Sequence, residues 1–101
     1  MNRTDVIFVR IYLTEGEGRL ADLLARLHDV EQVKGVTVFR GISGFGDSGE
    51  IHTSTLLDMS LDLPLVVEFF DSAEKINAIL SHLHSDFEPG HIVSWPATLV
   101  V

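Results

Sequence analysis

The chain has 101 residues, of which 46% are apolar and 22% charged, with a net charge of −8 and no cysteine. A chain of this length and composition can bury one core, so we expect residues 1–101 to form a single domain. The acidic balance disfavours nucleic acid as a partner, and the lack of cysteine excludes disulfides, thiol nucleophiles and thiolate metal sites. No apolar run approaches the ~20 residues that span a bilayer and no signal-peptide pattern opens the chain, so we expect no membrane insertion and a cytoplasmic location.

The first half of the chain alternates strand and helix signals. Residues 5–13 read DVIFVRIYL, a β-branched and aromatic run that predicts a strand, and the glycine-bearing residues 14–18 end it. Residues 19–30 are apolar at helical spacing, at Leu20, Leu23, Leu24 and Leu27. This pattern predicts an amphipathic helix. Residues 36–42, VTVFRGI, then predict a second strand after the helix-ending Lys34-Gly35.

The second half repeats the alternation after a polar interval. Residues 43–62 hold three of the eight glycines and show weak periodicity, which predicts a long mobile loop. Residues 65–70, LVVEFF, predict a third strand. Residues 71–83 predict a second helix, which Asp71 or Ser72 can cap.

The end of the chain completes the fold pattern. Residues 91–95 and 98–101 have strand composition, and we expect Pro96 to break the strand between them. The element order predicts an α+β fold of the ferredoxin-like βαββαβ type, with an antiparallel four-stranded sheet in the order 4-1-3-2, both helices on one face and a long loop between strands two and three. Neither face of the first and third strands is polar. We therefore expect another subunit to cover the helix-free sheet face, in a homo-oligomer.

Each of three neighbouring strands carries one charge near its middle, at Arg10, Arg40 and Glu68. Because the third strand lies between the first and the second, these side chains form a buried charge group if the strand registers agree. The alternative is three separately solvated charges, since sequence alone does not define the register.

A set of short motifs links the chain to a known family. Residues 35–46 read GVTVFRGISGFG and are followed by Ile51-His52-Thr53 and by Asp62-Leu63-Pro64. Over nearly the whole chain this combination resembles domain-of-unknown-function family 190, a P-II-like family, and more distantly the nitrogen-regulatory P-II signalling proteins. The P-II resemblance implies a trimer of ferredoxin-like subunits that binds adenine nucleotides in the clefts between subunits and signals through a long loop, here residues 46–58.

Two segments depart from the P-II pattern. P-II proteins carry a glycine-rich, basic, phosphate-gripping loop after the second helix, whereas residues 84–90 read HSDFEPG, without Lys or Arg. Residues 46–58 contain no tyrosine, so control by tyrosine nucleotidylation has no acceptor there. The remaining ligand candidates are a nucleotide with fewer phosphates than ATP, a nucleobase-bearing messenger or another small anion.

The candidate ligand-binding residues are gathered at the end of the second strand and in the loop after it: Arg40, Gly41, Gly44, Phe45, Gly46, Glu50, His52 and Thr53. The glycines can present N–H groups to an anion, or can serve only the geometry of a bulged strand end. Arg40 can neutralise a phosphate or carboxylate ligand, or can pair with Glu68 inside the fold. Glu50 and His52 can contact a ligand, a metal ion or a partner, or can remain solvated.

The sequence offers no nucleophile with a matched base and no Walker or Rossmann spacing, so we expect a binding protein rather than an enzyme. The five histidines lack metal-ligand spacing, so we expect neither a resident metal nor a cofactor. The favoured function is a small-molecule or nucleotide-binding signalling module that acts through residues 43–58 on a protein or transporter target. The alternatives are a divalent-metal-handling trimer similar to cation-tolerance proteins, and a small enzyme at an inter-subunit cleft.

Overall fold

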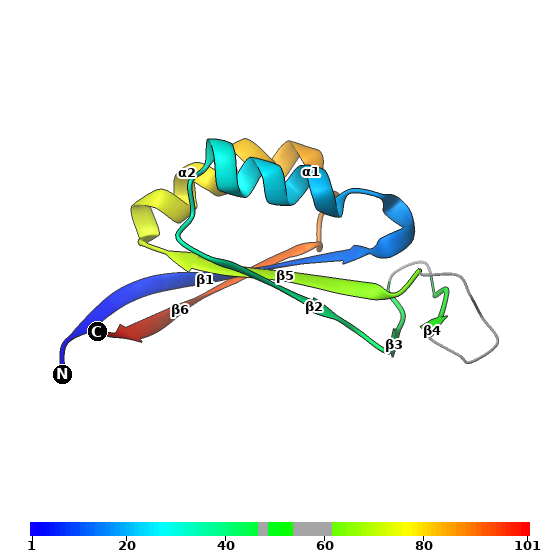
Figure 1. The fold of residues 1–101 in the computed structure, drawn as a ribbon, viewed down its shortest axis with the longest axis horizontal. Coiled ribbons are helices and arrows are strands. Elements are labelled where there is room, and N and C mark those ends of the chain that lie inside the picture. Colours follow the sequence, from blue (N-terminus) through cyan, green and yellow to red (C-terminus); the bar gives the residue numbers. More distant parts are fainter. Residues whose placement is uncertain (47–48, 54–61) are drawn as a thin grey trace.

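Four strands form one antiparallel sheet in the computed structural model, which describes residues 1–46, 49–53 and 62–101 (Figure 1). They are β1 (Arg3–Thr14), β2 (Val36–Arg40), β5 (Pro64–Asp71) and β6 (Ile92–Val100). Their order is β2-β5-β1-β6, with every neighbouring pair antiparallel. Counted along the chain, this is the predicted order 4-1-3-2, which is confirmed.

The last strand differs from the prediction, because β6 runs through Pro96 without a break. Pro96 pairs with Ile7 of β1. A proline removes one backbone donor, but β6 lies at the edge of the sheet with a neighbour on one side only, where strands tolerate proline. The predicted break at Pro96 is therefore wrong.

Two helices cover one face of the sheet (Figure 1). The first begins as α1 (Leu20–Ala25) and continues as a π-helical segment, η2 (Arg26–Val30). The second is α2 (Ala73–Leu83), and the hydroxyl of Ser72 caps it by accepting a hydrogen bond from the Lys75 N–H at 3.3 Å. Two 3₁₀ turns complete the set, η1 (Glu15–Glu17) after β1 and η3 (His84–Asp86) after α2. Within the residues that the structure describes, no helix is long and apolar enough to cross a membrane.

The core lies between this helical layer and the sheet. Alternate residues of the two central strands point into it, and these side chains are almost completely buried: Val9, Ile11, Val67 and Phe69. The helices contribute the apolar residues predicted from their spacing, together with partners on α2: Leu23, Leu27, Ile76, Ile79 and Leu83. Burial of one strand face in this way leaves the alternate residues on the opposite face of the sheet.

The helix-free face of the sheet carries an aromatic cluster. The ring of Phe8 lies 5.1 Å from that of Phe70 and stacks at 5.3 Å on that of Trp95. Phe39, on β2, is 51% exposed. Both helices lie on the other side of the sheet (Figure 1). That a second subunit covers these rings stays a prediction.

Arg10 and Glu68 face each other on this same surface. They are register partners on β1 and β5, and Arg10 Nε donates to a Glu68 carboxylate oxygen at 2.6 Å. The guanidinium of Arg10 also lies 5.4 Å from the centre of the Trp95 ring. The hydrogen bond to Glu68, and secondarily one to Tyr12, raises the pKa of Arg10 above its ordinary value.

Arg40 is not part of this charge group. The predicted group of Arg10, Arg40 and Glu68 is therefore wrong for Arg40. In the register between β2 and β5, Glu68 faces Thr37 and Arg40 faces Leu65. Register partners share a sheet face, and Leu65 points into the core. Arg40 therefore leaves the sheet on the helix side, away from Glu68.

The segment after β2 contains a short hairpin. Strands β3 (Ser43–Gly44) and β4 (His52–Thr53) pair antiparallel, with Ser43 opposite Thr53 and Gly44 opposite His52. The predicted long loop between β2 and β5 is confirmed, and it contains this hairpin, which the sequence did not predict. Strands of two residues are too short to show a period in the sequence. The rest of the predicted loop, at 47–48 and 54–61, lies outside the described residues.

Candidate functional site

Arg40 is held at one end of the sheet, where β2 ends close to the η1 turn. Its Nε donates to Glu15 Oε1 and its Nη2 to Oε2 at 3.1 Å, so the two side chains form a bidentate ion pair. The Arg40 side chain is 48% exposed and that of Glu15 is 19% exposed. The hydrogen bond to Glu15 raises the pKa of Arg40 above its ordinary value. The site therefore presents a permanently charged, oriented and half-exposed guanidinium.

Backbone contacts fix the turn that carries Glu15. The Glu15 N–H donates to the carbonyl of Leu63 at 2.9 Å, and the Gly16 N–H donates to Oδ1 of Asp62 at 2.8 Å. A Cβ atom on Gly16 would lie 2.5 Å from that carboxylate oxygen, so a larger residue there would displace the Asp62 side chain. The Asp62-Leu63 motif therefore has a structural use, which is to position η1 and its glutamate.

Two of the candidate glycines serve the packing of Pro64. The Gly41 N–H donates to the Pro64 carbonyl at 2.7 Å. A Cβ atom on either Gly41 or Gly44 would lie 3.1 Å from Cγ of Pro64. Because its N–H is already bonded, Gly41 does not offer it to an anion, and the structure favours the geometric alternative there. Around Gly46 nothing lies within 4 Å of an added Cβ atom.

The other candidates lie in or beside the hairpin. Phe45 and Glu50 are exposed. The backbones of His52 and Thr53 form β4, opposite Gly44 and Ser43. Of the predicted ligand-binding residues, the structure brings Gly41 and Gly44 together at Pro64, and Arg40 directly precedes Gly41.

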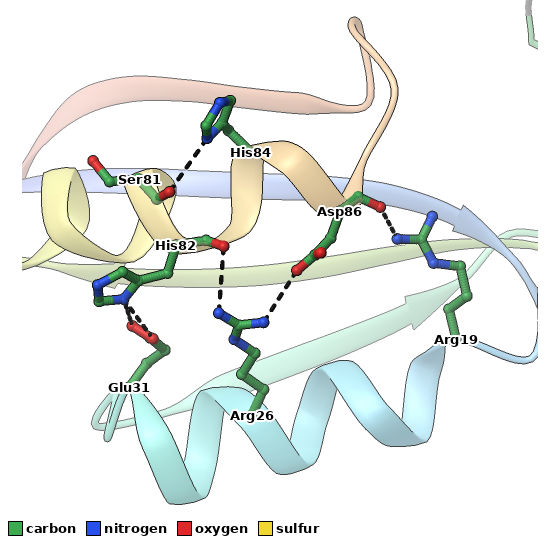
Figure 2. A network of polar contacts seen from close by, with 7 residues as sticks. All are labelled: Arg19, Arg26, Glu31, Ser81, His82, His84 and Asp86. Atoms are coloured by element: carbon green, nitrogen blue, oxygen red, sulfur yellow. Dashed lines mark hydrogen bonds and ion pairs between the residues drawn. The ribbon is translucent and has the colours of Figure 1, made fainter.

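Sequence reasoning missed two arginines that reach the turn after α2. Arg26 Nη1 donates to Oδ2 of Asp86 at 3.1 Å and its Nη2 to the His82 carbonyl at 3.3 Å (Figure 2). Arg19 donates to the Asp86 carbonyl and lies over the Phe87 ring, 4.2 Å from its centre. These contacts line a groove of about 280 Å³. The segment 84–90, which has no Lys or Arg of its own, is thus contacted by guanidinium groups of the first helical segment.

Glu31 and His82 form a second connection between the helices (Figure 2). Nδ1 of His82 lies 2.6 and 3.1 Å from the two carboxylate oxygens of Glu31, whose side chain is 3% exposed. The pair joins the end of η2 to α2. No cluster of three or more His, Cys, Asp or Glu side chains suited to a metal ion occurs among residues 1–46, 49–53 and 62–101.

A βαββαβ sheet with both helices on one face defines a PII-like fold of the ferredoxin-like type, and solved structures agree. CPII from Thiomonas intermedia K12, bound to ADP and bicarbonate, superposes with a TM-score of 0.66 at 21% identity, covering 97% of this chain and 89% of that one. The same protein bound to ADP, AMP and bicarbonate gives a TM-score of 0.68 at 20% identity, with the same coverage. A protein of Thermus thermophilus described as PII-like gives 0.61 at 20% identity, covering 98% of this chain and 91% of that one.

The chain belongs to the DUF190 family, described as "Uncharacterized ACR, COG1993", whose model matches residues 6–99. A UPF0166 protein of Aquifex aeolicus (strain VF5) is 30% identical over 86 residues, covering 85% of this chain and 88% of that protein. A UPF0166 protein of Methanocaldococcus jannaschii is 31% identical over 80 residues, covering 75% and 73%. The predicted family and fold are confirmed.

Proposed function

We propose that this protein is a homotrimeric, cytoplasmic PII-like module that binds an adenine nucleotide at a cleft between subunits and signals through residues 43–58. The fold supports the proposal, because it is shared with CPII, whose structures hold ADP, AMP and bicarbonate. The aromatic cluster of Phe8, Phe70 and Trp95 supports assembly, because an apolar sheet face of this kind is normally covered by another subunit.

The observation that carries the proposal is the position of Arg40. A guanidinium held in a fixed orientation at the end of the sheet suits a phosphate group, which accepts two parallel hydrogen bonds from its edge. Arg40 is the last residue of β2, opposite Leu65, and precedes Gly41, whose N–H donates to the Pro64 carbonyl, so it lies at the start of the segment proposed to carry the signal. Binding there can therefore change the conformation of that segment through differential contacts.

The proposal is for binding without catalysis. The acidic groups of the η1 turn, and Asp62 which contacts that turn, already have structural partners. Glu15 pairs with Arg40, Glu17 accepts from the Thr14 N–H at 2.9 Å, and Asp62 accepts from Gly16. Divalent-metal handling is the alternative that the sequence analysis left open, and the same ligand screen tests it.

A ligand screen with a matched variant tests the proposal. Thermal unfolding of the wild type is measured with AMP, ADP, ATP, cyclic nucleotides, bicarbonate and divalent metals, because a ligand that binds only the folded state raises the unfolding temperature. Arg40→Ala should lose the stabilisation by nucleotide. Arg3→Ala should retain the stabilisation by nucleotide, because it removes a positive charge at the start of β1, whereas Arg40 pairs with Glu15 just after the end of β1. Stabilisation by metals alone would favour the metal-handling alternative, and no stabilisation by any nucleotide would refute the proposal.

A further inference from the structure

We propose that Glu15 is a specificity-determining residue that competes with the ligand phosphate for Arg40. The inference rests on the proposed function, because it concerns the same guanidinium. Both Nε and Nη2 of Arg40 donate to the Glu15 carboxylate. The Nε–Nη2 edge is one of the two guanidinium edges that can bind a phosphate through two parallel hydrogen bonds, and a phosphate on this edge must replace the carboxylate.

The local structure makes Glu15 an effective competitor. Its backbone is tied to Leu63 and that of the next residue to Asp62, so the carboxylate is kept beside Arg40. An intramolecular partner held in this way acts at a high effective concentration. Arginine stays protonated, so ligand and glutamate compete through charge and hydrogen-bond geometry, and proton release from Arg40 plays no part.

The competition sets a charge requirement for the ligand. A carboxylate brings one negative charge, whereas a terminal phosphate brings between one and two at neutral pH and offers three acceptor oxygens. A polyphosphate can therefore displace Glu15 where a neutral or weakly charged nucleoside cannot. Displacement also frees the Glu15 side chain. The η1 turn that carries Glu15 is hydrogen-bonded to Asp62 and Leu63, which precede β5 and follow residues 54–61 in the sequence.

Glu15→Gln removes the competing charge and nearly preserves the shape of the side chain. We expect it to bind ADP and inorganic pyrophosphate about three- to tenfold more tightly than the wild type, the effect of releasing one well-oriented charged contact. Glu17→Gln is the matched control. It removes the same charge two residues away, but Glu17 bonds to Thr14 and not to Arg40, so its affinity should change by less than about twofold.

The experiment is calorimetric titration of the full chain with ADP and with pyrophosphate. It compares the wild type, Glu15→Gln, Glu17→Gln and the double variant Glu15→Gln/Arg40→Ala, each checked for folding by circular dichroism. The gain in affinity should vanish in the double variant. If Glu15→Gln does not fold, Glu15→Ala takes its place, because the backbone bond to Leu63 does not need the side chain.

The outcomes separate this inference from the proposed function. If the wild type binds ADP through Arg40 and Glu15→Gln binds no more tightly, the function stands and the competition is refuted. If ADP binds no variant but pyrophosphate shows the Arg40-dependent gain, the nucleotide function fails and the competition stands. If neither probe binds Glu15→Gln, the inference is overturned.

Discussion

Replacing His82 by alanine should leave the Glu31 carboxylate buried without its donor. The Glu31 side chain is 3% exposed, and its two oxygens lie 2.6 and 3.1 Å from Nδ1 of His82. An unsatisfied buried acceptor costs about 1–3 kcal/mol, and more if it is charged. The imidazole itself is 55% exposed, so its loss also lets water approach Glu31. We therefore expect the free energy of unfolding to fall by about 1–2 kcal/mol.

Urea unfolding followed by circular dichroism measures this loss, at one protein concentration because the proposed assembly would make stability concentration-dependent. His84→Ala is the matched control. His84 follows closely on the same helix end, but its Nδ1 contacts only the exposed carbonyl of Ser81, at 3.2 Å (Figure 2). Its replacement should change the stability by less than about 0.5 kcal/mol.

A double-mutant cycle isolates the contact itself. In a Glu31→Ala background the carboxylate is gone, so adding His82→Ala should lower the free energy of unfolding by less than about 0.5 kcal/mol. The reasoning is refuted if His82→Ala is no more destabilising than His84→Ala, or if its cost is the same with and without Glu31.

Two further predictions concern the sheet. Phe8→Glu places a charge between two aromatic rings of the helix-free face and should dissociate the proposed homo-oligomer in sedimentation velocity, whereas Val30→Glu, at an exposed helix end, should not. Unchanged sedimentation of Phe8→Glu would show that this face is not the interface. Gly41→Ala crowds Pro64 and should lower the free energy of unfolding by about 1 kcal/mol, whereas Gly46→Ala, in open space, should change it by less than about 0.5 kcal/mol. Equal stabilities of the two variants would contradict the close approach of Gly41 to Pro64.

Much of the fold could be predicted because its signals are local. Leu23 and Leu27 repeat at the helical period, and Val9 and Ile11 alternate with residues of the opposite sheet face. Given two helical crossovers, handedness and packing rules leave few sheet orders, so the order 4-1-3-2 followed from the element order. The serine cap of α2 is likewise local, since the hydroxyl of Ser72 reaches a backbone N–H three residues on.

The contacts around the candidate site could not be predicted, because they depend on register and on residues distant in sequence. Successive side chains of a strand point to opposite faces of the sheet. Whether Arg40 pairs with Glu68 therefore depends on the strand register, which the three-dimensional structure supplies. The true partner, Glu15, lies in a turn 25 residues earlier. Arg26 and Asp86 are 60 residues apart, and no sequence period links them.

Calorimetric titration of ADP into the wild type and into Arg40→Ala tests the proposed binding function. The proposal predicts saturable binding to the wild type and a large loss of affinity in Arg40→Ala, with both proteins sedimenting as the same oligomer. Absence of binding to the wild type, or equal affinity in the two proteins, would contradict the assignment of the nucleotide site to Arg40.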